Sequence, residues 1–186
     1  MKRWGVFLDR DGTLVPDAGY ARKPGQLVLY TNTGAALRKL QHAGALLIVV
    51  SNQSVVARGL LDLEGLLRMD ARLMSLCKRA GVTLSAIYNC THHPDFDGPC
   101  DCRKPEPGMI KKGLQRFKLA PSECYIVGDH ATDLEAGRRV GLCTVHVLTG
   151  HGRRHRNEIK EARLADGLAR DIAGAAEWIL ETRSKN

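Results

Sequence analysis

Two aspartates stand two residues apart directly after a short apolar run near the start of the chain, in the segment Asp9–Leu14 (DRDGTL). Burying two carboxylates close together costs free energy unless a cation or a reaction requires them. An EF-hand calcium loop is one alternative, but the sixth and twelfth positions counted from Asp9 are Leu14 and Tyr20 instead of glycine and glutamate. A plain Asp-Gly turn is the other alternative. The pair therefore indicates a cation site or a carboxylate that takes part in chemistry.

A second group of residues with chemical potential lies between residues 90 and 102. Cys90-Thr91-His92 and Cys100-Asp101-Cys102 place three thiols and one imidazole in two close pairs. This donor set suits a tetrahedral structural Zn²⁺, with the ligands Cys90, His92, Cys100 and Cys102. A loop of free thiols is the alternative, but the other three cysteines lie singly in apolar stretches, as core cysteines do. Four protein ligands leave no open position, so this Zn²⁺ would shape its loop and not activate water.

Both groups must be positioned by regular elements, and the hydrophobic pattern predicts which ones. Short apolar runs predict buried strands at Trp4–Leu8, Ala45–Val50, Ala86–Tyr88, Cys124–Val127 and Cys143–Val147. Helical periodicity and capping residues predict helices at Thr33–Ala43, Asp62–Ala80, from Pro107 onward, Asp133–Val140 and Ile172–Leu180. The alternation predicts an α/β fold with a mostly parallel sheet covered by helices on both faces, in one domain over residues 1–186.

Ligands of such sheets bind outside the carboxyl ends of the strands. Four polar segments follow predicted strands and are expected to meet at that edge, namely Asp9–Leu14, Ser51–Ser54, Cys90–Lys104 and Gly128–Asp133.

In their order along the chain, these segments resemble the motifs of the haloacid dehalogenase (HAD) superfamily. Phe7–Leu14 is similar to its first motif, and the later motifs are matched by Ser51, Lys104, Asp129 and Asp133. The resemblance implies a Rossmann-like HAD fold and Mg²⁺-dependent phosphatase chemistry. It also implies that Asp9 is the nucleophile and Asp11 the general acid and base.

Phosphoryl transfer explains why these residue types are needed. Attack by Asp9 on phosphorus would form an aspartyl-phosphate. Asp11 would protonate the leaving oxygen and then take a proton from the attacking water. Charge gathers on the phosphoryl oxygens, and the Lys104 ammonium and the Ser51 hydroxyl would offset it.

The resemblance also implies a set of Mg²⁺ ligands. Asp9 and Asp129 would hold the metal through their carboxylates, and Asp11 through its backbone carbonyl. Asp133 would orient the site without contacting the metal. For Ser51 and Asp133 taken singly, helix capping is an equally good interpretation.

The segment Cys90–Cys102, called the cysteine loop below, and the run Cys102–Met109 narrow the resemblance to zinc-containing HAD phosphatases without a large cap domain. D-glycero-D-manno-heptose 1,7-bisphosphate 7-phosphatases are favoured by Asp17–Tyr20 and Ser51–Ser54. Such enzymes remove the 7-phosphate during ADP- or GDP-heptose precursor synthesis for lipopolysaccharide or surface polysaccharide. Histidinol-phosphate phosphatases, to which Gly128–Asp133 is also similar, are the alternative, and nucleic-acid 3′-phosphatases are a third. The substrate contacts carried over by position are Asp17, Gly19, Tyr20, Ser51, Asn52, Gln53, Ser54, Arg103, Lys104 and His130.

Composition limits the partners. The 186 residues carry a formal net charge of +8, which favours an anionic partner. Only 5% of residues are aromatic, and the basic segment Arg153–Arg163 also contains Glu158 and Glu161. A nucleic-acid partner is therefore not expected. The apolar runs are too short to span a bilayer, and Asp9 interrupts the first of them, unlike a secretory leader. We therefore expect a cytoplasmic monomer that acts on a small phosphorylated sugar, with no membrane partner.

Overall fold

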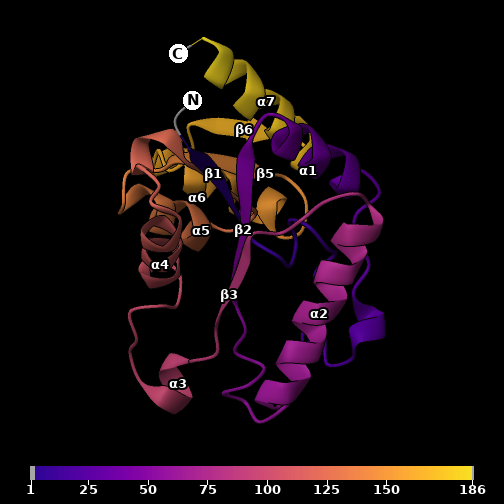
Figure 1. Cartoon of the computed structure of the whole chain (residues 1–186). Helices are drawn as coiled ribbons and strands as arrows, with labels where there is room; N and C mark the ends of the chain where they lie inside the picture. Colours follow the sequence, from indigo (N-terminus) through magenta and orange to yellow (C-terminus); the bar gives the residue numbers. More distant parts are fainter. Residues whose placement is uncertain (1–2, 186) are drawn as a thin grey trace.

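The computed structural model describes residues 3–185 and contains one parallel sheet (Figure 1). Its six strands are β1 (Trp4–Leu8), β2 (Ala45–Asn52), β3 (Ala86–Cys90), β4 (Tyr125–Gly128), β5 (Cys143–Val147) and β6 (Gly167–Ala169). They lie in the order β3-β2-β1-β4-β5-β6, and all neighbouring pairs are parallel. β1 is central, with Val6 opposite Leu47 on one side and Tyr125 on the other.

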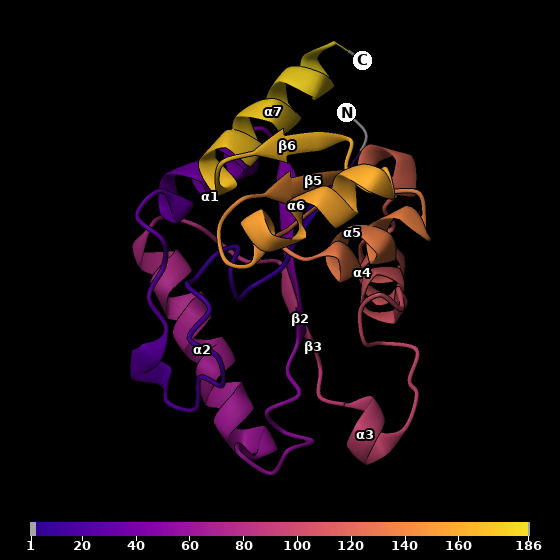
Figure 2. The same cartoon turned by 180° about the vertical axis from the view of Figure 1, so that it is seen from behind.

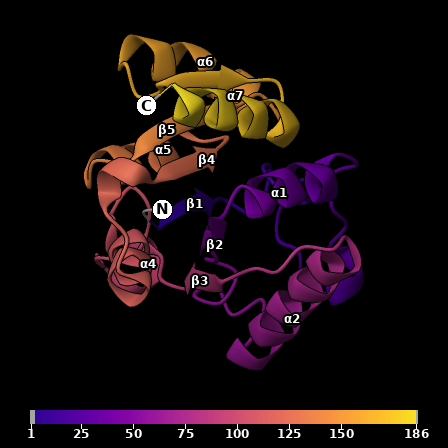
Figure 3. The same ribbon diagram turned by 45° about the horizontal axis from the view of Figure 1, so that its top comes forward.

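Helices cover both faces of the sheet (Figure 3). The described helices are α1 (Thr33–His42), α2 (Leu63–Arg79), α3 (Pro94–Asp97), α4 (Gly108–Phe117), α5 (Ala131–Arg138), α6 (Gly152–Glu161) and α7 (Ile172–Ser184), with 3₁₀ turns at Pro24–Gln26 and Pro121–Glu123. α1, α2 and α7 pack on one face, and α4 and α5 on the other. α6 packs outside α5, and α3 lies apart from the sheet, in the loop that follows β3 (Figure 2).

The period-two alternation of β1 divides the core into these two layers. Val6 and Leu8 face the α1, α2 and α7 side, where they meet residues such as Leu73. Phe7 faces the other side together with Ile110 of α4. All five side chains are fully buried. β1 therefore lies rigidly between two packed layers, and the polar residues that follow it are held in a fixed place.

The predicted fold class is confirmed, with local differences. β6 was missed because it is only three residues long and its Leu168 is exposed. The start of α5 at Asp133 was wrong by two residues. His130 caps this helix by accepting from the Thr132 N–H, and Asp133, the third residue of the helix, bonds back to the His130 N–H. Asp133 therefore does cap this helix, but as the third helical residue of a capping box and not as the N-cap.

The domain prediction covers residues 1–186 and so includes residues 1, 2 and 186, which lie outside the described residues; it stays a prediction. Over the described range, no helix is both long enough and apolar enough to cross a membrane.

Candidate active site

Three buried carboxylates and one lysine meet at the carboxyl ends of β1 and β4. Asp9 follows β1, Asp129 follows β4, and Asp133 lies in the first turn of α5. One oxygen of each lies within 4.8 Å of the others. Lys104 Nζ lies 2.6 Å from Asp9 Oδ1 and 2.6 Å from Asp133 Oδ1, and it donates to the Val50 carbonyl at 2.8 Å. The predicted nucleophile, lysine and acidic residues are therefore brought together.

The charges of this cluster do not cancel, because one ammonium faces three carboxylates. Burial raises the pKa of Asp9 well above its usual value, and it raises the pKa of Asp129 to about 6; Asp133 adds to both shifts. Burial opposes the charge of Lys104, but Asp133 and Asp9 raise its pKa, so the lysine stays protonated. Carboxylate oxygens with surplus negative charge are the donors that Mg²⁺ prefers. The residues present thus fit a divalent cation.

Two glycines let the backbone approach Asp129. A Cβ added at Gly12 or at Gly150 would lie 2.2 Å from Asp129 Oδ2, far inside van der Waals contact. Both glycines also have positive φ angles, 81° and 52°, which other residues rarely adopt. The same oxygen accepts a hydrogen bond from the His151 backbone N–H at 2.7 Å. Asp129 is therefore enclosed by backbone, and its orientation is fixed before any ligand binds.

Asp11 lies beside the cluster and contacts the end of β2. Gln53 Nε2 donates to Asp11 Oδ2 at 2.9 Å and to Ser51 Oγ at 2.7 Å. Ser51 is 1% exposed and lies within β2, so the helix-capping interpretation of this residue is wrong. Its hydroxyl instead belongs to a hydrogen-bonded group at the mouth of the site.

The predicted substrate contacts line two adjoining cavities of about 480 and 140 Å³. The larger contains the carboxylate cluster and is lined, among the predicted contacts, by Asp17, Ser51, Asn52, Arg103, Lys104 and His130. The smaller is lined by Asp17, Gly19, Tyr20, Asn52, Gln53 and Ser54. Both cavities share the lining residues Asp11, Asp17 and Asn52, so they adjoin; together they are called the recess, and the carboxylates lie in its larger cavity.

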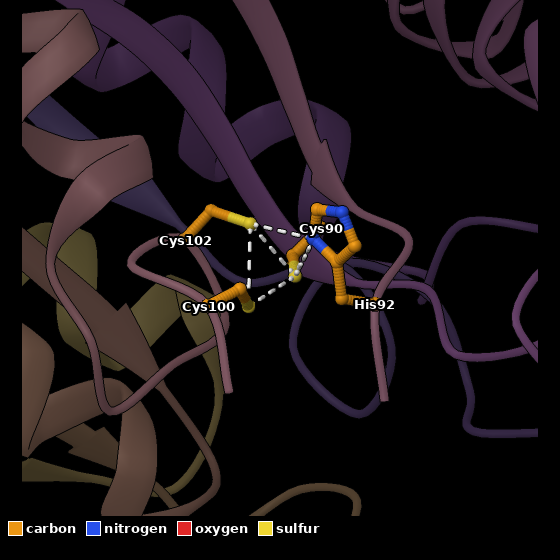
Figure 4. A group of neighbouring side chains, drawn as sticks. All are labelled: Cys90, His92, Cys100 and Cys102. Atoms are coloured by element: carbon orange, nitrogen blue, oxygen red, sulfur yellow. Dashed lines mark hydrogen bonds between the residues drawn. The ribbon is translucent and has the colours of Figure 1, made fainter. Parts of the chain in front are cut away.

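The three thiols and the imidazole converge on one point (Figure 4). The sulfur–sulfur distances are 3.0 Å for Cys90–Cys102, 3.6 Å for Cys100–Cys102 and 3.7 Å for Cys90–Cys100, and His92 Nδ1 lies 3.2 Å from Cys102 Sγ. A tetrahedral Zn²⁺ site with bonds of about 2.3 Å has sulfur–sulfur edges of about 3.8 Å. Although burial opposes it, backbone N–H groups of Arg103 and Cys102 lower the pKa of Cys100 to about 7, whereas burial raises the pKa values of Cys90 and Cys102. This donor set therefore fits a thiolate-binding metal.

The cysteine loop is connected to the carboxylate cluster through Lys104. The Asn52 side chain accepts from the Lys104 backbone N–H at 3.0 Å and donates to the Lys104 carbonyl at 3.1 Å. Arg103 donates to the His92 carbonyl at 3.1 Å. Lys104 is thus placed by β2 on one side and by the cysteine loop on the other.

A HAD-hydrolase-like family model matches residues 101–175. A D-glycero-β-D-manno-heptose-1,7-bisphosphate 7-phosphatase of Haemophilus ducreyi is 39% identical over 156 residues, which are 81% of this chain and 86% of that protein. A D-glycero-D-manno-heptose-1,7-bisphosphate 7-phosphatase of Thermosynechococcus vestitus is 35% identical over 189 residues, with 96% of each chain covered. The chain belongs to this heptose bisphosphate phosphatase family.

A solved structure agrees with this membership. The D,D-heptose 1,7-bisphosphate phosphatase from B. bronchiseptica, complexed with magnesium and phosphate, has a TM-score of 0.86 and 29% sequence identity, covering 97% of this chain and 99% of that chain. The HAD resemblance is therefore confirmed, and so is the choice of the heptose phosphatase family over the histidinol phosphatases.

Sequence reasoning missed part of the recess of this family member. Thr132 and His151 also line the larger cavity, and His151 Nε2 lies 2.7 Å from Asp17 Oδ2. His151 follows β5, so the rule that placed the other segments at strand ends also applies to this loop. The Asp17–His151 pair joins two loops across the mouth of the cavity.

His130 lines the same cavity, but its charge is disfavoured. Burial and the neighbouring His155, whose ring centroid lies 3.9 Å away, lower the pKa of His130. Its Nδ1 accepts from the Thr132 N–H at 3.3 Å, which leaves Nε2 as the protonated ring nitrogen. The lowered pKa thus favours the neutral form of His130, with Nε2 as its hydrogen-bond donor.

Proposed function

We propose that this protein removes the 7-phosphate of D-glycero-D-manno-heptose 1,7-bisphosphate, as its family relatives are named for doing. A buried carboxylate cluster with one lysine, open to a recess of the predicted substrate residues, is the observation that supports this activity. The product would supply the ADP- or GDP-heptose precursors of surface polysaccharides.

Asp9 attacks phosphorus, and its new P–O bond replaces the bond to the sugar oxygen. Asp11 gives its proton to that oxygen, so the sugar leaves as an alcohol. Asp11 then takes a proton from water, which attacks the aspartyl-phosphate and releases inorganic phosphate. Asp9 returns as a carboxylate and Asp11 as an acid. Lys104 and Ser51 offset the charge on the phosphoryl oxygens throughout.

Mg²⁺ is the proposed catalytic metal, held by the carboxylates of Asp9 and Asp129 and the backbone carbonyl of Asp11. Bound there, it supplies positive charge to the phosphoryl oxygens. Asp133 uses both oxygens on protein donors, Lys104 and the His130 N–H, which supports an orienting role away from the metal. Zn²⁺ is the proposed structural metal of Cys90, His92, Cys100 and Cys102. We infer that the enzyme is a cytoplasmic monomer with no membrane or nucleic-acid partner.

A panel of phosphate esters tests this function. The enzyme should release phosphate from both anomers of the heptose 1,7-bisphosphate in the presence of Mg²⁺ with a much higher kcat/KM than from histidinol phosphate or a 3′-phosphorylated oligonucleotide. Product analysis should show heptose 1-phosphate. A preference for histidinol phosphate, or release of the 1-phosphate, contradicts the proposal.

Proton binding by the carboxylates should compete with Mg²⁺. Because burial raises the pKa of Asp129 to about 6, the folded metal-free protein binds protons more tightly than the unfolded chain. This group should therefore lower the stability of metal-free protein as pH rises from about 4 to about 6. Mg²⁺ must displace those protons, so its affinity should fall about tenfold from pH 7 to pH 5. Calorimetric titration with MgCl₂ at both pH values measures this, and equal affinities would contradict it.

Removing the metal of the cysteine loop should weaken both stability and turnover. We expect a zinc-selective chelator to lower the free energy of unfolding by about 3 kcal/mol, or the midpoint of thermal unfolding by about 6–12 °C, because the thiolates lose their shared cation. Turnover should also fall, since the loop places Lys104. All assays contain excess Mg²⁺. Cys100→Ser should abolish the response to chelator and Cys143→Ala should keep it; a response that survives Cys100→Ser contradicts the assignment.

A further inference from the structure

An arginine is buried between the two aspartates of the first motif. Arg10 is 2% exposed and is among the largest fully buried side chains of the described chain. Burying a guanidinium is costly unless carboxylates or other acceptors surround it. Its Nε and one terminal nitrogen lie 3.0 and 2.8 Å from the same oxygen, Oδ2 of Asp11. The arginine thus forms an ion pair with the carboxylate of Asp11, the proposed general acid and base.

These contacts make the two oxygens of Asp11 different. Oδ2 receives two N–H groups from Arg10 and a third from Gln53 Nε2 at 2.9 Å. A carboxylate oxygen has two lone pairs, so three donors leave Oδ2 no place for a proton. The Asp11 side chain is 24% exposed and lines the larger cavity. Oδ1 is therefore the oxygen that can carry a proton to a substrate in that cavity.

A second acidic residue, Asp70, interacts electrostatically with Arg10. Asp70 of α2 accepts from Asn89 Nδ2 of β3 at 2.6 Å. Burial raises the pKa of Asp70, and the charge of Arg10 opposes that rise. Among the described residues, the second terminal nitrogen of Arg10 and Oδ1 of Asp70 are both buried without a hydrogen-bond partner. The guanidinium thus pairs with the Asp11 carboxylate and is also attracted by the charge of Asp70.

We propose that Arg10 is a positioning residue: it occupies Oδ2 of Asp11, fixes the rotation of that carboxyl group and leaves Oδ1 to exchange the proton with the leaving oxygen and with water. Asp70, which accepts a hydrogen bond from Asn89, attracts Arg10 by its charge. The inference rests on the proposed function, because it assigns the atom through which Asp11 acts.

Leaving-group dependence tests this role. The proton matters for an alkyl phosphate, whose alkoxide is a poor leaving group, and hardly for 4-nitrophenyl phosphate. Arg10→Met should lower kcat/KM for a sugar phosphate by about 10²-fold and for 4-nitrophenyl phosphate by less than about fivefold, since general acid catalysis is worth about 10²–10⁴-fold. A merely structural defect lowers both equally, and equal losses would overturn the inference.

A double-mutant comparison keeps the test decisive if Arg10→Met folds poorly. Arg10→Lys retains the charge but not the two-nitrogen contact, and it should show a smaller loss with the same leaving-group dependence. In an Asp11→Asn background, neither substitution at Arg10 should lower the remaining kcat/KM for the sugar phosphate further. An undiminished effect in that background means that Arg10 does not act through Asp11.

A matched control lies near the amino-terminal end of β1, at the opposite end of the strand from Asp9 and Asp11. Arg183 contacts the ring of Trp4, at the start of β1, and pairs with Glu123 at 3.4 Å. Arg183→Met also removes a paired arginine and should leave the ratio of the two kcat/KM values unchanged. The wild-type protein separates the two proposals: if it hydrolyses no sugar phosphate, the proposed function fails, whereas uniform losses in Arg10→Met overturn only the role of Arg10.

Discussion

Asp9→Asn should abolish turnover while leaving the protein folded. The amide keeps the shape of the side chain but is not a nucleophile, so no aspartyl-phosphate can form. We expect kcat to fall on the order of 10³-fold or more, as when a covalent nucleophile is removed from other enzymes. The variant also loses one of three crowded negative charges, so its free energy of unfolding without Mg²⁺ should not fall. Phosphate release and thermal unfolding in EDTA measure the two effects.

Asp62→Asn is the matched control for that experiment. Asp62 caps α2 by accepting from the Gly65 N–H at 2.6 Å and lines neither cavity of the recess. Because asparagine caps helices as well as aspartate does, both activity and stability should be kept. If Asp9→Asn were to keep a tenth or more of the wild-type kcat, Asp9 could not be the nucleophile.

Lys104→Met should have the second largest effect, and on stability as well as rate. Removing the ammonium leaves three buried carboxylates without a cation, so we expect a loss of about 3 kcal/mol in the free energy of unfolding at pH 7.5 without Mg²⁺. Excess Mg²⁺, or a shift to pH 5 where the carboxylates gain protons, should recover part of this loss. The kcat should fall by about 10²–10³-fold even with Mg²⁺, because one group that offsets transition-state charge is gone.

Lys39→Met controls for the loss of a lysine in an ion pair. Lys39 pairs with Glu177 at 2.9 Å, but both side chains are more than half exposed. Such surface pairs contribute about 0–1 kcal/mol, so stability and activity should stay near those of the wild type. Denaturant unfolding with and without Mg²⁺ distinguishes the variants. If the free energy of unfolding of Lys104→Met at pH 7.5 without metal were unchanged, repulsion among the three carboxylates would not destabilise the protein.

Most of the fold could be predicted because its signals are local. β1 and the first six residues of β2, Ala45–Val50, are unbroken apolar runs, and α2 has a repeating apolar face after the Asp62 cap. β6 has no such signal, since only three residues pair and the middle one is exposed. The start of α5 depends on a histidine cap, and Asp133 was the stronger capping residue by type alone.

In the candidate site, too, some positions could be predicted from the sequence and others could not. Asp9, Asp129 and Lys104 follow strands or the cysteine loop, so their meeting follows from the topology of a parallel sheet. The pairing of His151 with Asp17 depends on the path of two loops. The electrostatic interaction of Arg10 with Asp70 depends on how the fold places α2, and no spacing along the chain encodes it.

The central place of β1 has a consequence for how the enzyme is made. β1, β2 and β3 leave the ribosome before β4 exists, although β4 is the second neighbour of β1. Until then one edge of β1 is unpaired, and Asp9 lacks Asp129 and Asp133. An unfinished chain therefore holds a nucleophile that can neither bind metal nor attack phosphate. The sheet closes around β1 only once β4 and the start of α5 have been made, so hydrolysis can begin only after that stage of synthesis.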